Sequence, residues 1–149
     1  MRRLTILLVA IAAAAVAVPV AFAANAHWIT GPTVTTSDTS LTVSGKAAGL
    51  GNTTQTVDFM LSGTVTVDSR CYTKSGNKPQ AANKQESIPV NQTGTFDIRN
   101  GSVSVSFTIG PPLSTLKCPG GQYVVVESLS YDLWLRSASF STLDTHLTS

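Results

Sequence analysis

The chain has 149 residues, of which 12% are charged and 42% are hydrophobic, and its formal net charge is +2. This length suits about one domain. The low charge, with Val, Ile, Leu and Phe spread along the chain, excludes disorder as the main state. A nucleic-acid-binding domain would carry a large clustered excess of Lys and Arg, so the composition excludes that class too.

The first 26 residues have the order of a secretory signal peptide. Arg2 and Arg3 precede an uncharged apolar stretch, residues 4–18, and small residues follow Pro19. A retained membrane anchor is the alternative, but the stretch has about 15 residues, fewer than the roughly 20 that span a bilayer. We therefore expect a secreted, extracellular protein with a signal peptide of bacterial type.

Two positions satisfy the small-residue rule for signal cleavage. Ala23 and Ala26 each end an Ala-x-Ala sequence, so we expect cleavage after one of them and a single secreted β domain over residues 27–149. Removal of Arg2 and Arg3 leaves eight basic and eight acidic residues. The secreted domain is therefore neutral, and we expect a monomer that leaves the membrane after cleavage.

Cys71 and Cys118 are the only cysteines. Outside the cell they should form a disulfide, closing a loop of about 48 residues and stabilising the domain by about 4 kcal/mol. A catalytic thiol would need a nearby base and a reducing compartment. We therefore expect the bridge to be structural.

The segments after the signal predict strands. Residues 33–36 and 41–47 form two short strands that lead into a turn at Gly49-Leu50-Gly51-Asn52. Residues 56–71 alternate, with the apolar side chains on one parity. Such a strand would be roughly 50 Å long. Since this is too long for a small domain, we expect it to bend or break at Gly63.

Two later segments predict loops. Residues 73–84 and Arg70 together carry four positive charges and no acid, with Lys74 and Lys84 at the ends of the loop. This loop could bind an anionic wall polymer or polar glycan, or it could simply keep the domain soluble. Residues 110–121 contain three prolines and Cys118. They predict a rigid loop, which is common between strands and is also how protein inhibitors present themselves to proteases.

The strongest local signal is a hairpin. Asn100-Gly101 lies between two alternating apolar runs, and this dipeptide accepts the positive φ angles of a type I′ turn. In that register Ile98 faces Val103 and Phe96 faces Val105.

The last alternating run carries apolar residues on one parity from Tyr123 to Leu135, and the parity changes near Arg136-Ser137. This change predicts a bulge or a turn. About seven or eight short strands predict an all-β protein: an antiparallel β-sandwich, immunoglobulin-like and closed by one disulfide. A jelly roll or a small barrel is the alternative.

The chain lacks the motifs of the common enzyme classes, including H-E-x-x-H, G-x-S-x-G, phosphate-binding glycine loops and zinc-spaced Cys/His clusters. The acidic residues are scattered singly: Asp38, Asp58, Asp68, Glu86, Asp97, Glu127, Asp132 and Asp144. Two of them could still meet in space as an acid and a base. We assign no catalytic residue, metal ligand or cofactor, and the sequence favours a non-catalytic protein.

His27 and His146 suggest a copper-binding alternative. If cleavage follows Ala26, His27 offers both its amine and its imidazole, and His146, close to Asp144, adds a second imidazole. Two imidazoles and an amine suit Cu(II). The set resembles the histidine brace of periplasmic copper carriers and lytic polysaccharide monooxygenases, and the resemblance is confined to these residues. If cleavage follows Ala23, both histidines are incidental.

Trp134 suggests a second binding mode. It lies on the polar parity of its run, beside Asp132 and Arg136, so we expect it to be exposed. An exposed Trp flanked by polar groups can stack on a sugar ring, as in carbohydrate-binding modules. The alternative is packing under a loop or against the sheet edge.

Several short motifs together resemble a group of small secreted microbial proteins of unassigned function. The motifs cover nearly all of the chain after the signal: Gly49-Leu50-Gly51-Asn52, Cys71, Gly76-Asn77-Lys78-Pro79, Asn83, Phe96, Asn100-Gly101, Pro111-Pro112 and Cys118-Pro119-Gly120-Gly121. This chain has Ser75 where the group carries a further Gly. The resemblance implies a secreted, disulfide-closed domain and no particular activity.

The sequence thus predicts a domain that binds a glycan or a protein at or outside the cell surface. We expect the ligand at the loop from Lys74 to Lys84 or at the face that carries Trp134. The alternatives are a copper protein that uses His27 and an inhibitor-like protein that uses residues 110–121.

Overall fold

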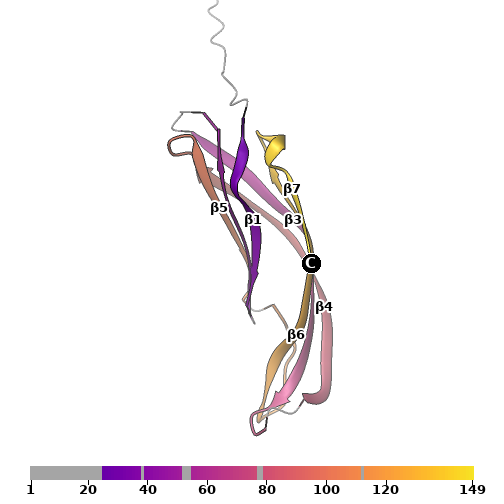
Figure 1. Ribbon diagram of the computed structural model, residues 1–149. Helices are drawn as coiled ribbons and strands as arrows, with labels where there is room; N and C mark the ends of the chain where they lie inside the picture. Colours follow the sequence, from indigo (N-terminus) through magenta and orange to yellow (C-terminus); the bar gives the residue numbers. More distant parts are fainter. Residues whose placement is uncertain (1–24, 38, 52–54, 77–78, 112) are drawn as a thin grey trace, which may run out of the picture.

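The computed structural model describes residues 25–149, apart from residues 38, 52–54, 77–78 and 112. The chain forms two antiparallel sheets, one with the strand order β1-β2-β5 and one with the order β4-β3-β6-β7 (Figure 1). The elements are β1 (His27–Thr36), β2 (Leu41–Ala48), β3 (Thr56–Thr73), β4 (Pro79–Asp97), β5 (Ser102–Ile109), β6 (Gln122–Ser137), the short 3₁₀ helix η1 (Ser141–Leu143) and β7 (Thr145–Thr148). Within the described residues, no helix has the length and apolar character needed to cross a bilayer.

The core lies between the two sheets. The apolar parity of β3 faces inward, and Val57, Phe59 and Leu61 are at most 2% exposed. Aromatic rings continue this core, because Phe59 contacts Phe96 edge-on and Phe96 contacts Phe107 edge-on. Alternation along β3 therefore separates a buried face from a polar outer face, as the sequence predicts.

The expected antiparallel β-sandwich is confirmed, and the described residues form seven strands. In the constant-type immunoglobulin order, the fourth strand joins the sheet of the first, second and fifth. Here β4 pairs with β3 instead. The sheets are therefore three-stranded and four-stranded, and the outer face of the larger sheet is wide.

Gly63 does not break β3, which runs through it for 18 residues. Of the two outcomes expected at Gly63, a bend or a break, the break does not occur. The long strand fits because β3, β4 and β6 continue past the end of the three-stranded sheet and curve as they do so (Figure 1). Gly63 has a φ of +140°. A Cβ at this position would lie 2.1 Å from the carbonyl oxygen of Asp132, so only glycine allows β6 to approach this closely.

The turn at Asn100-Gly101 is confirmed, whereas the predicted pairs Ile98–Val103 and Phe96–Val105 do not form. Both turn residues have positive φ angles, 50° and 71°, and a single bridge flanks them, from Arg99 to Ser102. The strands then separate into different sheets, so Phe96 pairs with Val57 and Val105 pairs with Gly45. Ile98 and Val103 are both buried in the core but are not partners in a ladder.

Most of the loop predicted at residues 73–84 is strand. β4 starts at Pro79 and pairs with β3 to give a ladder that places Lys84 opposite Ser69. Pro79 and Pro89 are tolerated because β4 is an edge strand. The described part of the connection is the turn at residues 74–76.

The parity change predicted near Arg136-Ser137 is a turn, because β6 ends at Ser137. β6 also has an irregularity that the sequence did not indicate: its pairing with β3 shifts register between Asp68 and Ser69. Because of this shift, Val126 and Leu129 both pack against the core, although they lie three residues apart. Even-numbered residues therefore face inward before the shift and odd-numbered residues after it.

Candidate functional site

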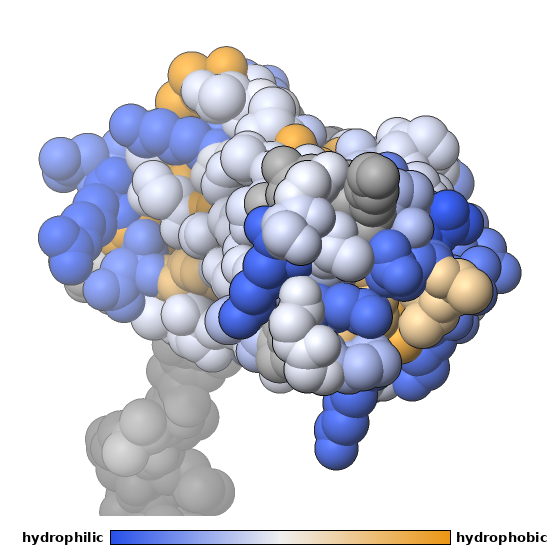
Figure 2. Space-filling view, turned by 90° about the horizontal axis from the view of Figure 1, so that it is seen from below, coloured by the Kyte–Doolittle hydropathy of each residue, from blue (hydrophilic) through white to orange (hydrophobic). Residues whose placement is uncertain are grey.

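The positive charges expected beside Cys71 are largely compensated. The guanidinium of Arg70 lies 3.5 Å from the carboxylate of Glu127, and the ammonium of Lys84 lies 3.0 Å from that of Glu86. Lys74 is exposed in the turn at residues 74–76, and Lys78 lies outside the described residues. Seen from this end, the surface shows hydrophilic and intermediate residues, with hydrophobic ones in small separate areas (Figure 2). The pairing weakens the argument for an anion-binding loop.

Glu127 also orders a neighbouring aromatic side chain. The hydroxyl of Tyr72 donates a hydrogen bond of 2.8 Å to the Glu127 carboxylate, and this bond raises the pKa of Tyr72 above its usual value of 10.0. The Tyr72 ring lies 6.3 Å from that of Tyr123. Arg70 and Tyr72 therefore both contact the Glu127 carboxylate, and the three side chains form a cluster on the sheet surface.

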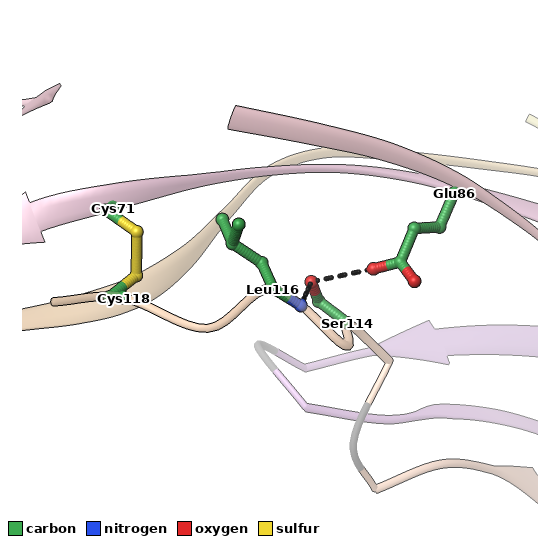
Figure 3. Close-up of a disulfide and its surroundings, with 5 residues drawn as sticks. All are labelled: Cys71, Glu86, Ser114, Leu116 and Cys118. Atoms are coloured by element: carbon green, nitrogen blue, oxygen red, sulfur yellow. Dashed lines mark hydrogen bonds between the residues drawn. A yellow bond between two sulfur atoms is a disulfide. The ribbon is translucent and has the colours of Figure 1, made fainter. Parts of the chain in front are cut away.

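The expected disulfide between Cys71 and Cys118 is confirmed, with a Cα–Cα distance of 5.6 Å. It ties the connection between β5 and β6 to the inner side of β3 (Figure 3). Cys71 is fully buried, so the bridge lies at the core, where a disulfide has a structural role.

Glu86 holds the same connection at a second point. Its carboxylate accepts hydrogen bonds from the hydroxyl and the N–H of Thr115 and from the hydroxyl of Ser114, and Figure 3 shows the bond from Ser114. Lys84 donates to the Thr115 hydroxyl. The Thr115 bonds, with smaller contributions from Lys84 and Ser114, lower the pKa of Glu86 to about 2.

These contacts bear on the inhibitor hypothesis for residues 110–121. An inhibitory loop presents its contact residues to solvent, whereas Leu113 is only 2% exposed and packs in the core. Ser114 and Thr115 are turned toward Glu86, and Cys118 is held by the disulfide. The geometry favours a structural role for this loop as the cover of the inner face of β3.

The outer face of the four-stranded sheet carries the expected exposed tryptophan. Trp134 is 38% exposed, and its indole stacks on the imidazole of His146, with the ring centroids 4.4 Å apart and the planes at 8°. The guanidinium of Arg136 lies over the indole, 5.1 Å from its centroid. His146 Nε2 lies 2.6 Å from the carboxylate of Asp132. Register explains the grouping, because Trp134 on β6 pairs with His146 on β7.

A depression of about 620 Å³ lies next to this group on the same sheet. Its lining comes from β4, β3, β6, the turn after β6 and the residue that follows η1: Asp58, Phe59, Met60, Thr93, Gly94, Thr95, Arg136, Ser137, Ala138 and Asp144. Arg136 belongs to both features, since it lines the depression and also lies over Trp134. The volume is typical of a small-molecule site.

The polar groups of the depression are held in place but keep free hydrogen-bonding capacity. Asp58 accepts a bond of 2.6 Å from the Thr95 hydroxyl, and Asp144 accepts one of 2.9 Å from the backbone N–H of Ser137. Each bond uses one carboxylate oxygen. Among the described residues, Arg136 contacts an aromatic ring and forms no ion pair. The depression therefore offers both donors and acceptors to a ligand.

The two histidines of the copper alternative lie on different sheets. His27 opens β1, and its Nδ1 donates to the carbonyl oxygen of Asn25 at 2.6 Å. His146 belongs to β7 and faces Asp132. The described part of the chain holds no group of three or more His, Cys, Asp or Glu residues that could bind a metal ion.

The sequence identified Trp134, Arg136, Asp132 and His146 as notable, and the structure brings them together. It did not identify Met60, Thr93, Thr95 or Ser137 as site residues, because alternation shows which face a residue is on but not which strands are neighbours. No protein-family model matches the chain, and no curated protein matches it.

Proposed function

We propose that this chain is a secreted, non-catalytic binding domain that holds an extracellular glycan against the outer face of its four-stranded sheet. The observation that carries the proposal is Arg136, which lies over the exposed Trp134 and lines the depression that also contains Asp58 and Asp144. The glycan-binding surface is defined here as Trp134, Arg136 and the lining of the depression.

The chemistry of this surface matches a saccharide. Sugar hydroxyls both donate and accept, so they pair with the free carboxylate oxygens and with the guanidinium. Apolar sugar faces need an apolar or aromatic contact. Met60 in the depression and the exposed indole of Trp134 beside it supply one. Because His146 stacks on the indole and the Arg136 guanidinium also lies over it, we place the sugar against the part of the ring that these two side chains leave exposed and against the adjoining depression.

The charge balance of the surface narrows the ligand. Asp58 and Asp144 line the depression, and Asp132 contacts His146, which stacks on Trp134. Among the described residues that line the depression, Arg136 is the one cation. Excess negative charge repels phosphate and carboxylate groups. We therefore expect neutral glycans or amino sugars to bind in preference to anionic polymers.

The proposal also includes export. Arg2-Arg3, the apolar stretch and the Ala-x-Ala sites form a signal peptide of bacterial type in the sequence. A disulfide between Cys71 and Cys118 is compatible with an oxidising compartment. On this basis we infer a bacterial protein that works outside the cell as a monomer.

A pull-down on insoluble polysaccharides, followed by titration with soluble oligosaccharides, tests the proposal. The wild-type protein should be retained by at least one neutral or amino-sugar polymer. Trp134→Ala and Arg136→Ala should each lower the affinity about tenfold, which corresponds to about 1.4 kcal/mol. Tyr123→Ala is a matched control, because Tyr123 is 37% exposed and lies elsewhere, and it should bind like the wild type.

Two results would overturn the proposal. One is that none of the polymers retains the wild-type protein, and the other is that Trp134→Ala and Arg136→Ala bind as well as Tyr123→Ala. Chromatography of the oligosaccharide after prolonged incubation tests the non-catalytic part. Unchanged sugar is expected, whereas shortened products that disappear in Asp58→Asn or Asp144→Asn would identify a hydrolase instead.

A further inference from the structure

The segment just before β1 is part of the folded core. Ala26 is 8% exposed and belongs to the core cluster, and its carbonyl oxygen accepts a hydrogen bond of 2.9 Å from the Thr142 hydroxyl. Thr142 lies in η1, more than one hundred residues away in sequence. This bond connects the start of the three-stranded sheet to the end of the four-stranded one.

Asn25 is held just as closely. Its carbonyl oxygen accepts from His27 Nδ1 at 2.6 Å, and it lies so near Gly49 that a Cβ there would be 2.2 Å from it. Gly49 has a φ of +76°, a conformation that suits glycine. Together, Asn25 and Ala26 form an N-terminal latch that packs on the end of β2 and on η1.

From these contacts, and resting on the export proposed above, we infer that the signal peptide is cleaved between Ala23 and Ala24. A signal peptidase would hydrolyse this bond with one water molecule, leaving a carboxylate on Ala23 and a free amine on Ala24. Cleavage after Ala26 would instead remove both latch residues. It would leave the Thr142 hydroxyl without its acceptor and uncover the core beside Gly49, which costs free energy.

Cleavage before Ala24 has a chemical consequence for His27. With Ala24 first, the amino terminus is three residues away from His27, so amine and imidazole do not belong to one residue. The Nδ1 of His27 carries the hydrogen that it donates to Asn25, so this nitrogen cannot bind copper at the same time. The latch therefore excludes a copper brace that uses an amine together with the Nδ1 of His27.

Intact mass spectrometry and N-terminal sequencing of the protein secreted by a bacterial host that expresses residues 1–149 test this inference. We expect a first residue of Ala24. A first residue of His27 would overturn the inference and leave export intact, whereas a chain that keeps Met1 and stays in the cell would overturn export itself.

Two substitutions make the test independent of the wild-type result. Ala23→Leu removes the small residue before the inferred site and should cause the precursor to accumulate. Ala24→Leu disrupts only the Ala-x-Ala sequence that ends at Ala26, so cleavage after Ala23 should be unchanged. The opposite pattern would assign cleavage to Ala26.

The contribution of the N-terminal latch to stability can be tested separately from the position of cleavage. A form whose signal peptide is joined directly to His27 lacks the latch and should melt at a lower temperature than the form that begins at Ala24. Thr142→Val removes only the hydrogen bond to Ala26 and should cause a smaller loss in the same direction. Equal melting temperatures for all three would overturn the latch.

Discussion

At the residue scale, Glu86 makes the stability of the fold depend on acid pH, because its carboxylate holds the connection between β5 and β6. Its pKa is about 2 in the folded protein and 4.5 without the fold. Because the folded pKa is the lower one, the stabilisation is fully present above pH 4.5 and is lost as the pH falls toward 2. We predict that the melting temperature of the wild type falls more steeply between pH 4.5 and 2 than that of Glu86→Gln.

The control for this prediction is Asp97→Asn. Asp97 forms an exposed ion pair with Arg99, and both side chains are well exposed, so the substitution should have little effect on acid stability. If the melting temperatures of the wild type and Glu86→Gln fall equally between pH 6 and 2, Glu86 does not contribute to the acid transition.

Gly63 lies at a position that has no room for a side chain. A Cβ would meet the Asp132 carbonyl oxygen at 2.1 Å and the Leu133 Cα at 2.9 Å, and the φ is +140°. We predict that Gly63→Ala lowers the free energy of unfolding by about 3 kcal/mol or more, measured by urea denaturation. Gly31→Ala, with no atom within 4 Å of its Cβ, should change it by about 1 kcal/mol or less.

At the element scale, local patterns predicted local structure well. The alternation around Phe59 gave the buried face of β3, and Asn100-Gly101 gave a turn with two positive φ angles. Pairing partners were not predictable from the same patterns. The strands on either side of Asn100-Gly101 separate into different sheets, because β4 forms its ladder with β3 and β5 forms its ladder with β2.

The connection between β5 and β6 is held by the disulfide in addition to Glu86. We predict that Cys71→Ala/Cys118→Ala lowers the free energy of unfolding by about 4 kcal/mol, since the bridge closes a loop with a sequence separation of 47. The released connection should also be cut faster by trypsin at Lys117, which is exposed. Reduced wild type should behave like the double variant. If reduction changes neither the urea midpoint nor the cleavage rate, the bridge does not hold the connection.

At the scale of the whole molecule, the site depends on how distant segments meet. Trp134 and Arg136 stood out in the sequence because they occupy the polar parity of an apolar run. Their neighbours Thr93 and Asp58 come from β4 and β3, and no local pattern indicates that β4 joins the larger sheet. The site was therefore predictable in its aromatic and charged members but not in its shape.

Trp28 on β1 connects the two sheets through its contacts with η1, β7 and the core. Its indole N–H lies 3.0 Å from the Leu143 carbonyl oxygen and 3.1 Å from the Thr145 hydroxyl, while its ring contacts Phe59 in the core. Trp28→Phe keeps an aromatic ring but removes the N–H that donates to both oxygens, and the Leu143 carbonyl then keeps only its bond from the Thr145 hydroxyl. Unfolding should therefore become easier by about 1–2 kcal/mol.

Trp134→Phe is the matched control, because Trp134 is exposed on the outer face and the only other tryptophan. Its substitution should leave the urea midpoint nearly unchanged. Each variant retains a single tryptophan, so its fluorescence reports one site: Trp134 in Trp28→Phe and Trp28 in Trp134→Phe. An equal loss of stability in both variants would contradict a connection between the sheets through Trp28.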